Sequence, residues 1–158
     1  PDLGILAVGD LLMLGTTPIC WSGKVESLLT SLNLIKQMHP GIIVPGHGPI
    51  ADLGSVGRAI AYWEFFMESV DGLHQMGLSP AEITRSLISR SDFVRNGYHL
   101  MDPERNYLNV AMRCMALDGI SSLKELSKAQ KSPALWIELA SFARYFPEAT
   151  PKALHQPI

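Results

Sequence analysis

The chain has 158 residues, of which 47% are hydrophobic and 18% are charged, so it can bury a core as one domain or as one domain with an appendage. A formal net charge of −2 gives no reason to expect nucleic acid or an anionic membrane surface as a partner. No apolar run reaches the roughly 18 residues that a membrane-spanning helix needs, so we expect no membrane partner.

The two cysteines, Cys20 and Cys114, are far apart and form no C-x-x-C pair, which argues against a thiolate metal site. We expect two reduced thiols, which favours the cytoplasm without fixing the compartment, and a single disulfide is the alternative. The first residues carry no signal-peptide pattern and begin inside an apolar run. We therefore expect a fragment or processed product of a longer protein.

The first half of the chain predicts strands and helices in alternation. Residues 3–8 form an apolar run ending at Gly9-Asp10, which predicts a buried strand followed by a loop. Helical spacing of apolar residues over 24–38 predicts an amphipathic helix. Residues 42–44 predict a second buried strand, and 54–76 predict a long helix that ends before Gly77.

The second half predicts helices only. Ser79 and Glu82 form a capping box for a helix that ends near Ser89. Further helices are expected to begin at Asp102-Pro103, over 122–131 and at Ser132-Pro133, followed by a loose tail from Pro147. The change of composition near residue 78 predicts two units, 1–77 and 78–158.

Asp10 and His47 stand out by their positions. Each follows one of the two predicted strands, and a single helix lies between them. A right-handed crossover would make the strands parallel and would place both residues at the carboxyl edge of the sheet, where open α/β sheets bind ligands. Carboxylate and imidazole are good ligands for zinc, and also for iron or manganese.

The residues around His47 favour a fixed imidazole. Gly46 and Gly48 would let the backbone turn sharply and approach a bound ion, while Pro45 and Pro49 stiffen the turn. The alternatives are a surface turn for His47 and a capping or loop carboxylate for Asp10.

Gly9-Asp10-Leu11-Leu12 followed by Val44-Pro45-Gly46-His47-Gly48-Pro49 resembles the metallo-β-lactamase superfamily. The resemblance covers about residues 3–77, and a weaker one links 102–118 to the helical appendage of some members. It implies the C-terminal half of an αββα sandwich, here a βαβα unit, followed by an all-helical appendage. It further implies an aspartate that bridges two metal ions, normally zinc, and a histidine that ligates one of them.

In that family a metal-bound hydroxide attacks a small-molecule ester, thioester, lactone, lactam or phosphoester. The family's H-x-H-x-D-H run and its intermediate histidine have no counterpart here, and we expect them to precede Pro1. Five of the usual seven ligands are then missing, so we expect the chain alone to be inactive and to hold zinc weakly or not at all. No catalytic residue besides the two ligands is assigned.

The remaining histidines carry weaker expectations. His39 and His74 lie at predicted helix ends and are expected to be capping cations. His99 either lines a substrate cleft or lies in an ordinary loop, and His155 is expected to be solvated. Trp21 is expected either in the core or as a cover over the cleft.

A second hypothesis is a non-catalytic interaction module. A half-sandwich would leave one face of its sheet uncovered, and such an apolar face tends to find a partner. This predicts a homodimer in which each copy covers the other's sheet.

Overall fold

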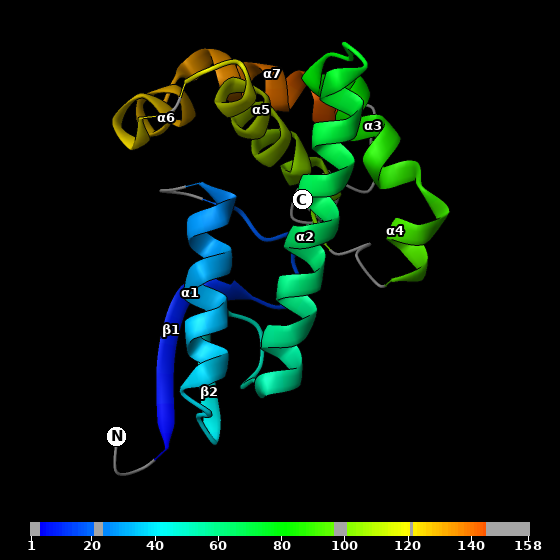
Figure 1. The fold of residues 1–158 in the computed structure, drawn as a ribbon. Coiled ribbons are helices and arrows are strands. Elements are labelled where there is room, and N and C mark those ends of the chain that lie inside the picture. The colour runs from blue at the N-terminus through cyan, green and yellow to red at the C-terminus, as the bar shows by residue number, and fades with distance from the viewer. Residues whose placement is uncertain (1–3, 21–23, 97–100, 121, 145–158) are drawn as a thin grey trace, which may run out of the picture.

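The structure is a computed structural model that describes residues 4–20, 24–96, 101–120 and 122–144. Two parallel strands, β1 (Ile5–Met13) and β2 (Ile42–His47), flank the helix α1 (Val25–Gln37) in sequence. The long helix α2 (Leu53–Gln75) follows β2 and runs from the sheet to the helical end of the molecule (Figure 1). The fold is thus mixed α/β and mostly helical, as expected, and the strands are parallel as the βαβ pattern predicted.

The helices after α2 form a second layer at its C-terminal end. They are α3 (Pro80–Ser89), α4 (Ser91–Arg95), α5 (Asn106–Leu117), α6 (Leu123–Gln130) and α7 (Pro133–Ala143), with a 3-10 turn η1 (Pro103–Arg105) before α5. The predicted helices of this half are present, and the short α4 was not predicted. The tail from Pro147, like Phe146, lies outside the described residues.

Local sequence signals mark the end of α2 and the start of α3. Ser79 Oγ accepts the Glu82 amide, and the Glu82 carboxylate accepts the Ser79 amide, so the predicted capping box is confirmed. At the end of α2, Gly77 has φ +79° and donates its amide to the His74 carbonyl at 2.8 Å. The positive φ of this glycine ends the helix in a left-handed cap.

The strand β1 differs from its prediction. It continues through Gly9 and Asp10 to Met13, so Asp10 lies within the strand rather than in a loop after it. The register shifts after Ala7 and again after Gly9, which has φ +53°. These irregularities place extra β1 residues opposite β2. As a result, β1 stays paired with β2 on both sides of Gly9-Asp10.

The strands are buried on one face only, which corrects the expectation of fully buried strands. Leu6 and Ile43 form a register pair on the covered face, where Ile43 is completely buried. On the other face, the large apolar side chains are 39% to 49% exposed. These are Ile5, Ile42 and Val44. We call them the outer sheet face.

The main core joins the sheet to α2 and continues into the second layer. Trp63 and Phe66 of α2 are almost completely buried, with ring centroids 5.5 Å apart. The same cluster includes Ile83 and Leu87 of α3 and Val110 of α5. The boundary predicted near residue 78 stays a prediction, but the two layers share this core.

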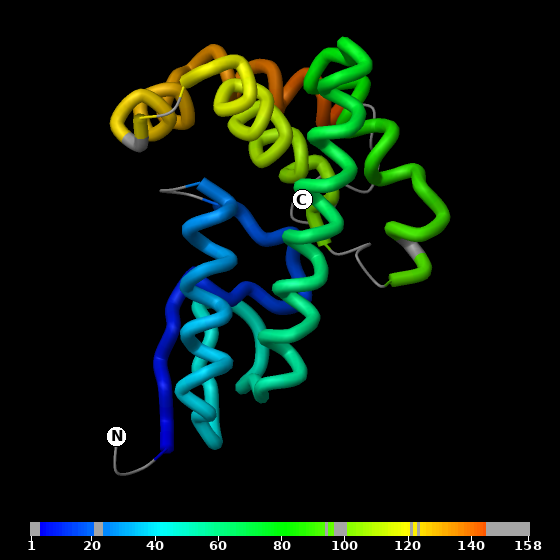
Figure 2. The backbone as a smooth tube through the Cα atoms, in the orientation of Figure 1, coloured from blue at the N-terminus to red at the C-terminus, as the bar shows by residue number. Residues whose placement is uncertain are grey.

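The segment after β1 crosses toward α2 and α5 before the chain returns to α1 (Figure 2). Thr17 donates its amide to the Met101 carbonyl at 2.9 Å. Asn109 of α5 accepts the Cys20 amide at 3.1 Å and donates to the Pro18 carbonyl at 2.8 Å. Polar contacts from the second layer therefore hold the described residues 14–20 of this segment. Cys20 and Cys114 do not form a disulfide, as expected.

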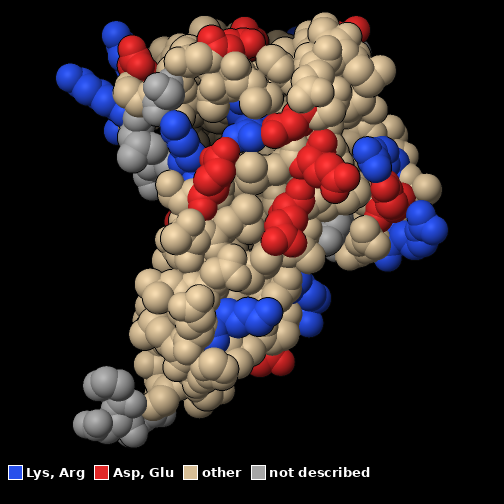
Figure 3. Space-filling view, viewed as in Figure 1, with Lys and Arg blue, Asp and Glu red and all other residues tan. Residues whose placement is uncertain are grey.

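None of the described helices is both long and apolar enough to cross a membrane. On the face shown in Figure 3, acidic side chains gather over the middle of the molecule, and the end built by α1 and the strands is mostly uncharged.

Candidate functional site

The register of the two strands brings Asp10 and His47 together. Met13 is paired with His47 at the end of the sheet, and Gly9 is paired with Pro45. Asp10 follows Gly9 along β1, and its Oδ1 lies 3.5 Å from His47 Nε2. The predicted convergence of these two side chains is thus present in the fold, with His47 as the last residue of β2.

The Pro-Gly-His-Gly-Pro segment needs its glycines because it touches β1. A Cβ on Gly46 would fall on Asp10 Oδ1 and would lie 2.7 Å from the Gly9 carbonyl carbon. A Cβ on Gly48 would lie 2.6 Å from the Leu14 carbonyl oxygen, and Gly48 has φ +91°. We expected these glycines to allow a sharp turn and the approach of an ion. The positive φ of Gly48 confirms the turn, the close approach of the two strands gives a further reason for both glycines, and the approach of an ion stays a prediction.

Both side chains of the pair remain accessible. His47 is 55% exposed and Asp10 is 54% exposed, so neither is sealed into the core. The backbone of His47, unlike its exposed side chain, is tied to β1, because Leu14 donates its amide to the His47 carbonyl at 3.0 Å. The arrangement is a solvent-accessible donor pair on a fixed backbone.

The donor spacing fits a shared metal ion. Zinc bonds to nitrogen and oxygen are about 2.0–2.1 Å long, so a tetrahedral ion holds two such donors about 3.3 Å apart. The observed 3.5 Å is close to that value.

The donor set is incomplete in the part of the chain that the structure describes. Within those residues, no group of three or more His, Cys, Asp or Glu side chains is placed to hold a metal ion. Catalytic zinc sites use three protein ligands and a water molecule. Asp10 and His47 could therefore supply two positions of such a site.

The other histidines lie away from this pair. The His39 ring contacts the Gln37 carbonyl at 2.7 Å, at the end of α1, as expected of a C-terminal cap. His74 Nε2 lies 3.0 Å from Asp118 Oδ1, which joins the ends of α2 and α5. The expectations for His99, His155 and Trp21 fall outside the described residues.

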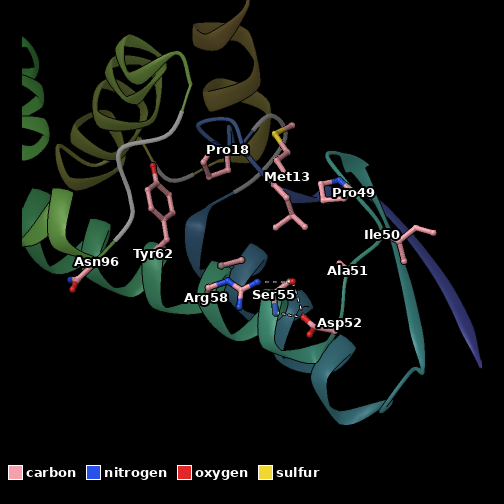
Figure 4. A pocket seen from close by; sticks show the side chains of 13 residues that line it. Met13, Pro18, Pro49, Ile50, Ala51, Asp52, Ser55, Arg58, Tyr62 and Asn96 are labelled. Carbon is pink, nitrogen blue, oxygen red and sulfur yellow. Dashed lines mark hydrogen bonds between the residues drawn. The ribbon is translucent and has the colours of Figure 1, made fainter.

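The sequence did not reveal a pocket beside the pair. Its volume is about 610 Å³, and it lies between α2 and the ends of both strands (Figure 4). Met13, the register partner of His47, and Pro49 line one side, and Arg58 and Tyr62 of α2 line the other. A helical i, i+3, i+6 series of Asp52, Ser55 and Arg58 was the one available signal for the polar part.

This polar series is internally bonded. Asp52 accepts the Ser55 amide and the Ser55 hydroxyl, each at 2.8 Å, and thereby caps α2. Arg58 Nη2 donates to Ser55 Oγ at 2.9 Å. The hydrogen bonds from Ser55 lower the pKa of the Asp52 carboxyl below its usual value. Asp52 is thus a structural carboxylate that stays ionised at neutral pH.

A buried carboxyl lies elsewhere in the fold. Glu104 in η1 is 9% exposed, and its Oε2 has no hydrogen-bond partner among the described residues. Burial raises the pKa of this carboxyl above its usual value. Glu104 does not line the pocket beside Asp10 and His47, so it is not part of the candidate site.

No model of a protein family matches the chain, and a search of curated proteins gives no significant match.

Proposed function

We propose that the chain is the C-terminal part of a metal-dependent hydrolase similar to the metallo-β-lactamase superfamily, in which Asp10 and His47 are metal ligands. The metal is zinc in this proposal, with two ions in the complete site. The substrate is a small molecule with an ester, thioester, lactone, lactam or phosphoester bond. When bound, the metal would supply activated water for hydrolysis.

The observation that carries the proposal is the 3.5 Å separation of Asp10 Oδ1 and His47 Nε2 at the end of a parallel sheet. The carboxylate offers anionic oxygen and the imidazole offers neutral nitrogen, a donor pair that suits zinc. Gly46 supports it, because only a residue without Cβ lets the His47 segment lie against Asp10. Two ligands do not complete a zinc site, so the proposal requires further ligands from residues outside this pair.

Metal titration of the chain tests the ligand assignment without requiring activity. Zinc affinity is measured by calorimetry, and cobalt(II) absorption reports the nitrogen and oxygen ligands. We expect weak binding that His47→Ala and Asp10→Asn each reduce at least tenfold. His74→Ala is the matched control, because His74 also faces an aspartate but at the distant helix ends. Zinc binding that His47→Ala leaves unchanged would refute the assignment.

Hydrolysis is tested on the intact protein in which these residues occur. A panel of esters, thioesters, lactones, lactams and phosphoesters is assayed with zinc and after chelation. Zinc-dependent turnover that His47→Ala abolishes and His74→Ala retains is expected. Turnover that survives both chelation and His47→Ala would show that another site does the chemistry.

A second candidate function is self-association through the outer sheet face. Ile5 and Ile42 form a register pair there, and both are more than 40% exposed, at 49% and 41%. A monomer that exposes neighbouring large apolar residues on an uncovered sheet has a surface suited to a second copy. In this reading the chain is an interaction module rather than part of an enzyme.

Sedimentation at increasing concentration tests this candidate. We expect a dimer that Ile42→Lys dissociates. Ile137→Lys is the control, because Ile137 is also strongly exposed but lies on α7. A monomer at all concentrations would exclude self-association, and a dimer that Ile42→Lys leaves intact would exclude the outer sheet face as its interface.

A further inference from the structure

The pocket beside Asp10 and His47 has the size and the walls of a small-molecule site. Its volume of about 610 Å³ lies within the range of about 300–1,000 Å³ that is usual for such sites. Most of its lining is apolar and includes Met13, Leu14, Pro18, Pro49 and Ala59. The Tyr62 hydroxyl donates to Asn106 at 2.7 Å, so Tyr62 offers the pocket its ring rather than its hydroxyl.

The pocket adjoins the donor pair through the backbone. Met13 is the register partner of His47, and Leu14 donates its amide to the His47 carbonyl. Pro49 follows the Gly48 turn, which packs against Leu14. The pocket lining thus includes the register partner of His47 on β1 and a residue two positions after His47, whereas Asp10 and His47 themselves do not line it.

Arg58 supplies the positive charge in the pocket lining. Its guanidinium carries five N–H donors, and a single hydrogen bond to Ser55 is found for it among the described residues. The exposed side chain lies opposite Met13 and Pro18 (Figure 4). Such a guanidinium can bind a carboxylate through two parallel hydrogen bonds.

Asp52 limits the charge of the ligand. Its carboxylate also lines the pocket and lies 2.8 Å from the hydroxyl of Ser55, which in turn contacts Arg58. A dianion such as a phosphate monoester would gain the attraction of one cation and suffer the repulsion of a fixed anion. A monoanion is repelled less strongly by the Asp52 carboxylate. The apolar walls favour a ligand with a hydrocarbon body.

We propose that this pocket binds monocarboxylates with an apolar acyl or aryl body, and that Arg58 holds the carboxylate. The hydrocarbon lies between the strand ends and the ring of Tyr62. That this ligand is the substrate of the neighbouring metal centre rests on the proposed function, whereas the binding itself does not. The substrate class then narrows to hydrolysable compounds that carry a free carboxylate.

Binding of octanoate and of its neutral analogue octanamide tests the pocket in the presence of a chelator. By calorimetry, the wild-type chain is expected to bind octanoate with at least tenfold higher affinity than octanamide. Arg58→Gln is expected to remove this preference and to leave octanamide binding unchanged, which also shows that the pocket is intact. Lys36→Gln removes an exposed charge outside the pocket and is expected to change neither affinity.

A second variant tests the apolar walls. Ala59→Phe would fill the pocket and is expected to weaken both ligands at least tenfold. Equal affinities of octanoate and octanamide for the wild type would overturn the proposal, as would an Arg58→Gln chain that keeps the preference. Octyl phosphate that binds more tightly than octanoate would overturn the monoanion assignment.

The two proposals fail separately. His47→Ala is expected to lose zinc and to keep octanoate. If His47→Ala leaves zinc affinity unchanged while Arg58→Gln weakens octanoate binding, the metal assignment fails and the carboxylate pocket stands. If zinc depends on His47 while octanoate binding is absent, the pocket assignment fails and the metal assignment stands.

Discussion

Gly46 lies so close to Asp10 that any larger residue at position 46 would overlap the Asp10 carboxylate. A side chain there must push the β2 end away from β1 or displace Asp10. The glycine is therefore part of the geometry that keeps Asp10 and His47 together.

Gly46→Ala is predicted to lower the free energy of unfolding by about 1–3 kcal/mol, because added atoms in a close-packed contact force the backbone to move. Urea unfolding measures this change. Gly57→Ala in α2 is the control, since a Cβ there meets nothing within 4 Å. Replacing a glycine inside a helix by alanine should raise stability by about 0.5–1 kcal/mol. A Gly46→Ala chain as stable as the wild type would contradict the close approach.

Arg113 of α5 joins three helices. Its guanidinium donates two hydrogen bonds of 2.7 Å to Asp71 of α2 and one to Glu26 of α1. The bonds to Asp71 raise the pKa of Arg113 above its already high value, so the charge is present throughout the neutral range. Arg113→Met is predicted to lower the free energy of unfolding by about 1–3 kcal/mol, because it leaves half-buried carboxylates unpaired.

Urea unfolding at constant pH measures the Arg113→Met effect. Arg90→Met is the comparison, because the ion pair of Arg90 is with Asp92 two residues away, and its contact with α2 is with the Phe65 ring rather than with a carboxylate. It should change stability little. Equal losses in the two variants would show that the three-helix contact of Arg113 adds nothing to stability.

Glu104 predicts a pH dependence of stability. Because burial raises its pKa in the folded chain, the folded state binds the proton more tightly than the unfolded state. Its contribution to the free energy of unfolding therefore falls as the pH rises from the usual 4.5 through the raised pKa. Glu104→Gln should remove this loss, so its stability relative to the wild type should increase over that interval.

Measuring the free energy of unfolding of both chains from acidic to neutral pH shows whether the stability difference changes in the predicted direction. Glu82→Gln provides the opposite case, because hydrogen bonds from Ser79 lower the pKa of Glu82. Its contribution is present above the usual pKa and is lost as the pH falls through the lowered value. A Glu104→Gln chain whose pH profile parallels the wild type would refute the assignment.

The helices were predictable because their signals are local. The period of apolar residues over 24–38 matches α1 to within one residue at each end, and Gly77 and Ser79 mark the boundary between α2 and α3. The length of β1 was not predictable, because Gly9-Asp10 usually marks a turn. Here a positive φ at Gly9 and two register shifts keep the strand paired beyond it.

The candidate site was predictable in part for a related reason. The convergence of Asp10 and His47 follows from parallel strands, which bring their carboxyl ends to one edge. The pocket was not predictable, because its lining comes from separate segments and depends on how α2 packs against the strand ends. No periodicity in the sequence reports such an arrangement. The metal role of the pair remains a prediction.

The bonds between the β1–α1 segment and the second layer have a consequence for unfolding. Asn109 satisfies backbone groups at Pro18 and Cys20, and the Met101 carbonyl accepts the Thr17 amide. If the helices beyond α2 detached, these groups would lose their partners and the shared core would open to water. Partial unfolding that frees only one layer is therefore costly, and the two layers should melt in a single cooperative transition.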